Sequence, residues 1–67
     1  MISKKLIYFR KEKGLSRYKL AILANVDDGL LSKIENNQVK DPKISTVNKL
    51  AKALDVKIDD LIDEGED

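Results

Sequence analysis

Residues 16–35 read SRYKLAILANVDDGLLSKIE, and this stretch predicts two short helices joined by a tight turn. Ser16 is a good N-cap for a helix over residues 17–24, and Asp27 is a good N-cap for a second helix that runs to about Glu35. Between them stands Asn25, a residue type that tolerates the left-handed backbone conformation of a tight turn. The stretch therefore favours two helices that cross close to each other.

Apolar residues in the same stretch lie where they would fix both helices to one core. Ala21 is small enough for the second helix to approach the first, and Leu23 is expected on the buried face as well. The remaining expected core positions are Leu20, Ala24, Val26, Leu31 and Ile34. Two helices at this spacing are typical of a helix-turn-helix unit.

Two other structures compete with this interpretation. Asp28-Gly29 between apolar residues is a β-hairpin signal, but the flanking Leu, Ala and Lys residues are helix formers. A generic helical bundle whose turn has a similar composition is the second alternative. The helix-turn-helix is favoured over both because its requirements for caps, turn and core are met together.

A further helix is predicted before this stretch, with Ser3 as its N-cap. Ile2, Leu6 and Phe9 follow the spacing of an apolar stripe on one helical face. Gly14 suits the left-handed position just after the end of the helix.

Two more helices are predicted after it. Asn36-Asn37 is expected to stop the preceding helix, and residues 38–42 form a loop because the residue before Pro42 avoids the helical region. Ser45 is the expected N-cap of a fourth helix, and residues 58–62 form a short fifth one. The apolar positions of these two helices are Val47, Leu50, Ala51, Leu54, Leu61 and Ile62.

The chain as a whole is expected to be an all-α, compact five-helix domain over residues 1–62, followed by a short acidic tail at residues 63–67. A length of 67 residues allows one domain with a thin core. The sequence contains no Cys and no His, which excludes disulfides and zinc sites of the Cys/His type. It also removes the commonest nucleophile and the commonest general base, so we expect no enzyme and no cofactor.

Other classes are excluded by the distribution of apolar residues. We find no apolar run long enough for a transmembrane helix and no signal peptide, so a cytoplasmic protein with no membrane partner is expected. No small-molecule site is evident. The clustered carboxylates near residues 59–64 lack the Gly and the spacing of a calcium loop.

The charge is unevenly distributed. The net charge is only +1, which by itself argues against binding to nucleic acid. Residues 1–40, however, hold nine Lys/Arg and four Asp/Glu, a balance of +5, whereas residues 41–67 hold four Lys and eight Asp/Glu, a balance of −4. The half that contains the predicted helix-turn-helix is thus the basic half, which is where nucleic acid would bind.

The segments SRYKLA (16–21), LSKIENN (31–37) and Val26 between them resemble the lambda repressor/Cro-like helix-turn-helix family of the XRE type. RKEKGLS (10–16) is similar to the family's entry into the motif, and DPKISTV (41–47) with KLAKAL (49–54) is similar to its fourth helix. The resemblance extends from about Leu6 to Leu61. It implies five helices around one core and binding of a double-stranded DNA operator by a homodimer, with the second motif helix in the major groove.

The resemblance implies a role for each residue at a matching position. Asp28, Gly29, Ser32 and Lys33 are expected to face base edges, where Lys33 can donate to guanine. Arg17, at a position where the family usually has Gln, is expected to bind phosphate through its guanidinium. The other expected DNA contacts are Tyr18, Asn36, Asn37, Gln38, Lys40 and Lys43. Arg10 and Glu35 match a structural ion pair, and Val56, Ile58, Leu61 and Ile62 can supply an apolar patch for the dimer.

Asp27 and Asp28 depart from the family pattern, because they place two negative charges on the helix that should approach a polyanion. Carboxylates cap a helix N-terminus well, and Asp28 can also accept a hydrogen bond from cytosine N4. The sequence therefore predicts a sequence-specific transcriptional regulator, a repressor, that places the helix Asp27–Glu35 in the major groove. The alternative is a protein-interaction module of the same fold, antitoxin-like or an antirepressor, with weak DNA binding.

Overall fold

The computed structural model describes residues 2–62, and within that range every regular element is an α-helix. The five helices are α1 (Ser3–Glu12), α2 (Arg17–Ala24), α3 (Asp28–Glu35), α4 (Ile44–Leu54) and α5 (Ile58–Leu61). The predicted all-α class and the number of helices are confirmed, and the hairpin alternative at Asp28-Gly29 is wrong because both residues lie in α3. The acidic tail, residues 63–67, lies outside the described residues. None of the described helices is long and apolar enough to cross a membrane.

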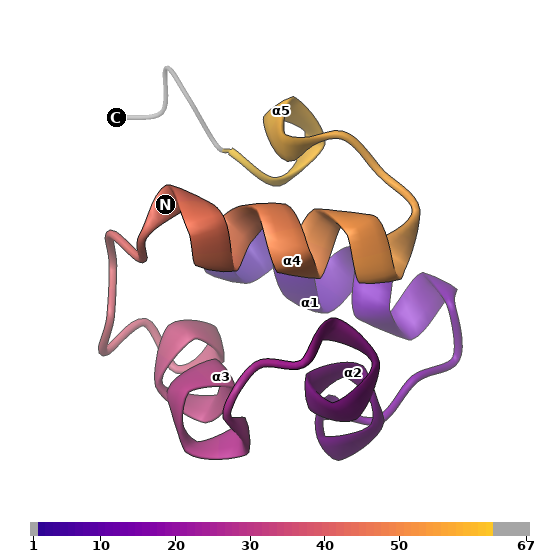
Figure 1. The fold of residues 1–67 in the computed structure, drawn as a ribbon, viewed down its shortest axis with the longest axis horizontal. Helices are drawn as coiled ribbons and strands as arrows, with labels where there is room; N and C mark the ends of the chain where they lie inside the picture. The colour runs from indigo at the N-terminus through magenta and orange to yellow at the C-terminus, as the bar shows by residue number, and fades with distance from the viewer. Residues whose placement is uncertain (1, 63–67) are drawn as a thin grey trace.

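The helices are arranged around α4 and α1. α2 and α3 lie next to each other on one side of α4, and α5 lies on the opposite side (Figure 1). α4 packs against α2 and α5, while α1 packs against α3 and α5. The α2–α3 pair is therefore held from behind by both long helices, which leaves its outer surface open to solvent.

One apolar core lies between the helices. Six of the seven side chains that were predicted to fix the helix-turn-helix are buried, namely Leu20, Ala21, Ala24, Val26, Leu31 and Ile34. The completely buried large side chains of the described part are Leu6, Leu20, Leu31, Ile34, Leu50, Leu54 and Leu61. The prediction for Leu23 is wrong, because this side chain is 55% exposed. α2 packs through Leu20, Ala21 and Ala24, and the helical rotation of 100° per residue carries Leu23 away from that face.

The predicted caps of the helix-turn-helix are confirmed. The Ser16 hydroxyl accepts a hydrogen bond from the Lys19 N–H at 3.0 Å, and Asp27 Oδ2 accepts one from the Leu30 N–H at 3.0 Å. Each bond satisfies an N–H that the first turn of a helix leaves without a backbone partner.

The two caps predicted outside the motif are wrong. Ser3 is already the first residue of α1, and its neighbour Ile2 is buried in the core while accepting the Leu6 N–H through its carbonyl at 2.9 Å. Burial of Ile2 thus starts the helix one residue before the hydroxyl can cap it. Ser45 is the second residue of α4, which begins directly after the extended residue Lys43. At the other end of the chain, α5 stops at Leu61, one residue earlier than predicted.

The first four helices end in the same way. A residue with positive φ follows the helix, and the next N–H bonds to a carbonyl five residues back, which is the Schellman arrangement. The four positive-φ residues are Gly14, Asn25, Asn37 and Asp55. The corresponding bonds are Leu15 to Arg10 at 3.0 Å, Val26 to Ala21 at 3.0 Å, Gln38 to Lys33 at 2.8 Å and Val56 to Ala51 at 2.9 Å. The stops at Gly14, Asn25 and Asn37 were predicted, whereas the one at Asp55 was not.

Asp55, the residue that follows α4, is unfavourable at this position for two reasons. Its φ of 59° strains a residue with a Cβ, and its carboxylate lies at the negative end of the α4 dipole. We expect Asp55→Gly to raise the free energy of unfolding by about 1 kcal/mol, measured by urea denaturation. The control is Asp55→Ala, which removes the charge but keeps the Cβ, and should gain less. An equal gain in unfolding free energy in both variants would mean that the charge of Asp55, and not its backbone conformation, destabilises the native state.

Candidate nucleic-acid interface

α2 and α3 form a compact unit with a short turn. Three residues connect the helices, beginning with Asn25 in the left-handed conformation at φ 57° and ψ 45°. Val26 follows and is buried, and Asp27 then caps α3. Three residues are enough for the turn, because each has its own role. Asn25 reverses the direction of the chain, Val26 anchors the turn in the core, and Asp27 caps α3.

α3 has one face in the core and one toward solvent. Leu31 and Ile34 are buried, whereas the predicted base-reading residues lie on the opposite side. Asp28, Gly29, Lys33 and Asn36 are exposed and Ser32 is half-buried. These five positions follow one another at spacings of one and three residues, which on a helix forms a single stripe. Asn36 Nδ2 lies 3.5 Å from the Ser32 hydroxyl along this stripe.

The structure explains why a residue without a side chain fits at Gly29, which was not predicted from the sequence. A Cβ built on this residue would lie 3.0 Å from Asp27 Oδ2, the oxygen that caps α3. A larger residue would therefore push against the cap. The local signal was present in the sequence, since the cap stands two residues before the glycine.

The loop after α3 continues the polar surface. The N–H groups of Gln38 and Val39 both bond to the Lys33 carbonyl, at 2.8 and 3.2 Å, so the start of the loop is tied to the end of α3. Gln38, Lys40 and Lys43 are exposed, and Asn37 is half-buried. The predicted loop residues are thus placed beside the outward stripe of α3.

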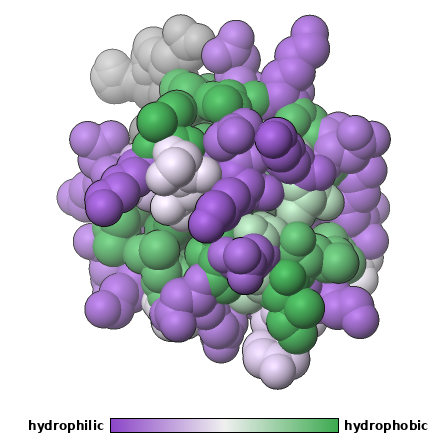
Figure 2. Space-filling view, viewed as in Figure 1, coloured by the Kyte–Doolittle hydropathy of each residue, from purple (hydrophilic) through white to green (hydrophobic). Residues whose placement is uncertain are grey.

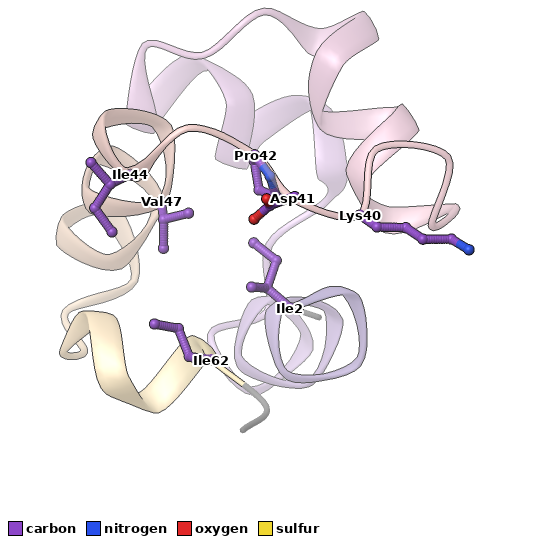
Figure 3. A pocket seen from close by; sticks show the side chains of 7 residues that line it. All are labelled: Ile2, Lys40, Asp41, Pro42, Ile44, Val47 and Ile62. Atoms are coloured by element: carbon purple, nitrogen blue, oxygen red, sulfur yellow. The ribbon is translucent and has the colours of Figure 1, made fainter. Parts of the chain in front are cut away.

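Apolar side chains border this loop on the side of the core, next to residues 40–42. Figure 3 shows Ile2, Val47 and Ile62 pointing toward one another across a hollow, while the Lys40 side chain points away from it. The hollow has a volume of about 320 Å³ and is bordered by Pro42 of the loop. The ammonium group of Lys40 is therefore directed to solvent, where an anionic partner can reach it.

The starts of the two motif helices are joined by an ion pair. Arg17, the first residue of α2, has its Nε 3.9 Å from Oδ1 of Asp28, the first residue of α3, and both side chains are almost half exposed. The contact places a positive charge beside the carboxylate of Asp28 on the exposed surface of the motif. The contact was not predicted from the sequence, because it depends on how the N-termini of the two helices meet.

The Arg10–Glu35 pair implied by the resemblance is confirmed. Arg10 Nε lies 2.7 Å from Glu35 Oε2, and Nη2 lies 3.1 Å from Oε1, so the guanidinium holds the carboxylate with two bonds. A third donor, Nη1, bonds to the Leu15 carbonyl at 2.9 Å. The pair fixes the last residue of α3 to α1, and through Leu15 it also fixes the approach to α2.

Comparison with known proteins identifies the family of this arrangement. The family described as Helix-turn-helix matches residues 6–61. The chain belongs to this helix-turn-helix family. The match runs from within α1 to the end of α5, in agreement with the resemblance to the lambda repressor/Cro-like branch.

Two relatives of this helix-turn-helix chain are regulators named SinR. The HTH-type transcriptional regulator SinR of Bacillus subtilis is 41% identical over 64 residues. These residues are 96% of this chain and 58% of the relative, so the chain spans little more than half the length of that protein.

Two solved structures have the same fold. The N-terminal DNA-binding domain of SinR from Bacillus subtilis has a TM-score of 0.91 at 39% identity, over 100% of this chain and 97% of that one. SinR, named as the master regulator for biofilm formation, in complex with DNA has a TM-score of 0.90 at 40% identity, over 94% of this chain and 100% of that one. The five-helix arrangement is thus shared with a domain that has been captured on DNA.

Proposed function

We propose that this chain binds double-stranded DNA with sequence preference and acts as a transcriptional repressor. The observation that carries the proposal is the outward stripe of α3, which presents Asp28, Ser32 and Lys33 on the exposed face of a helix-turn-helix. The relatives support it, since one SinR structure is a DNA complex. In this proposal α3, with its cap Asp27, enters the major groove.

The proposed contacts divide into two groups. Asp28, Ser32 and Lys33 face base edges, with Gly29 giving the helix a close approach. The remaining residues hold the phosphates and set the position of α3 on the duplex. These are Arg17, Tyr18, Asn36, Asn37, Gln38, Lys40 and Lys43.

A homodimer on a two-fold symmetric operator is part of the proposal, because a single α3 covers only a short stretch of the groove. The apolar patch predicted for this contact needs a correction. Leu61 is completely buried in the core and cannot contact a second copy. Val56, Ile58 and Ile62 are only partly buried, so they remain candidates for the contact.

The proposal is tested by measuring binding to DNA selected from a random pool, at several salt concentrations. Affinity should fall steeply as salt rises, because lysines release counterions from the phosphates. Lys33→Ala is expected to lose about tenfold affinity for the selected site and to relax its base preference. Lys40→Ala is expected to weaken selected and random DNA alike, by about threefold.

The two lysines serve as controls for each other, because both are exposed and both variants remove one charge. An equal loss on all DNA for both variants would contradict the division into base and phosphate contacts. Binding without salt dependence, or without preference over random DNA, would reject the repressor and favour the protein-interaction module. The mass of the complex on a symmetric site tests the dimer, with two chains expected.

A further inference from the structure

α2 has large apolar side chains on the face that points away from the core. Its buried side is formed by Leu20, Ala21 and Ala24. On the opposite side, Tyr18 is 66%, Ile22 57% and Leu23 55% exposed. Figure 2 shows the corresponding hydrophobic surface gathered at the lower right, over the position of α2 in Figure 1.

These side chains form one patch. Tyr18 and Ile22 are four residues apart, as are Lys19 and Leu23, and the two rows are adjacent on the helix. We call these four residues the outer face of α2. Three of its four members are apolar or aromatic, whereas a surface helix normally has polar residues there. A helix that is apolar on both sides indicates a second surface that covers it.

The apolar part of the patch, Ile22 and Leu23, is needed neither for the fold nor for the proposed DNA contacts, which include only Tyr18 from this face. The three side chains are more than half exposed, so they bury little area in the core. Ile22 and Leu23 carry no group that hydrogen-bonds phosphate or a base edge. On α4 a single large apolar side chain, Ile44, is more than half exposed, and Ser45, Lys49 and Lys52 are exposed polar residues of the same helix.

The charge on α2 decides what kind of partner fits. α2 carries Arg17 and Lys19 and no acidic residue. Two copies of this face would bring like charges together, so a second copy of the chain is a poor occupant. A membrane is also a poor occupant, since a helix of eight residues held in a core offers only three apolar side chains.

We propose that the outer face of α2 docks an amphipathic helix of a partner protein whose apolar stripe is flanked by carboxylates. The apolar stripe would cover Ile22 and Leu23, and a carboxylate would pair with Lys19. α2 is about 12 Å long, which matches roughly two turns of such a partner. The inference rests on Ile22, Leu23 and Lys19, which lie outside the proposed DNA contacts; Tyr18 is shared by both surfaces.

The experiment uses a synthetic helical peptide of about 14 residues as the probe, with leucines three and four residues apart and glutamates on both flanks. Its binding to the full chain is followed by amide chemical shifts. Saturable shifts are expected at α2, and the matched peptide with lysines in place of glutamates should bind at least about tenfold more weakly.

Ile22→Ser/Leu23→Ser should weaken binding of the acidic peptide by about tenfold or more. Ile44→Ser is the control, because Ile44 is an equally exposed isoleucine on α4. Circular dichroism checks that each variant remains helical. Failure of the acidic peptide to saturate at millimolar concentration, or equal binding of the basic peptide, overturns the proposal.

Two other partners for this face, a second copy of the chain and a membrane, would give different experimental results. A dimer of the chain that sediments as such and is lost in Ile22→Ser/Leu23→Ser would overturn the proposal in favour of a second copy. Binding of the chain to vesicles of phosphatidylglycerol and phosphatidylcholine, lost in the same variant, would overturn it in favour of a membrane.

Discussion

Replacing Glu35 with Ala is expected to lower the free energy of unfolding by about 3 kcal/mol, measured by urea denaturation with circular dichroism. The two side chains of the Arg10–Glu35 pair are only 14% and 6% exposed. The substitution leaves the Arg10 guanidinium in a partly buried site with the Leu15 carbonyl as its remaining hydrogen-bond partner. A domain of this size is stabilised by only about 3 to 10 kcal/mol, so the loss is a large fraction of the total.

The double substitution Arg10→Met/Glu35→Leu separates the cost of an unpaired charge from the value of the pair. It removes both charges and keeps similar volume, so it should cost much less than Glu35→Ala alone. The chain also offers an exposed pair for comparison: Asp28→Ala, which breaks the contact with Arg17, should change stability by about 0.5 kcal/mol or less. A loss below about 1 kcal/mol in Glu35→Ala would show that water reaches Arg10 and that burial does not govern this pair.

The Arg10–Glu35 pair also shows what the sequence can predict. The two residues are 25 positions apart, and no local pattern connects them. Only the resemblance to a family implied the contact, and the structure confirms it. By contrast, the caps Ser16 and Asp27 and the turn at Asn25 could be predicted directly, because each depends on a bond or a backbone angle within three residues.

The predictions that failed depend on packing across the chain. Ser3 was expected to cap α1, but burial of Ile2 starts the helix earlier. Leu23 was expected in the core, because a helix that is apolar on all sides does not reveal which side will be covered. Leu61 was assigned to a dimer surface, although α5 needs it to close the core against α1 and α4.

The residues of the candidate site stay predictions, while their positions in the fold are now known. The residues on α3 and its following loop come from a helical period and a resemblance; in the structure most of them are exposed, and the start of the loop is bonded to the end of α3. The contact between Arg17 and Asp28 was not predicted, because it depends on how the N-termini of two helices meet. This contact changes the expected behaviour of the most unusual residue of the surface.

Asp28→Ala is expected to act in opposite directions on two kinds of DNA. On random DNA it removes a negative charge that faces phosphates, so affinity should rise by about fivefold. On the selected site it removes a carboxylate that can accept from cytosine N4, so affinity should fall by about tenfold. Measuring both with the same protein preparation makes the result independent of its active concentration.

Asp28→Asn sharpens this test, because it keeps the size of the side chain and changes its hydrogen bonding. A carboxylate accepts from cytosine N4, whereas an amide can bond to adenine N6 and N7 together. Selection from random DNA should therefore shift from cytosine to adenine at one position in each half-site. Asp55→Asn is the matched control, since it removes the same charge at the far end of α4 and should leave the selected sequence unchanged. If Asp28→Ala raises affinity for every sequence equally and Asp28→Asn selects the wild-type site, Asp28 only repels DNA, and Arg17 serves to reduce that repulsion.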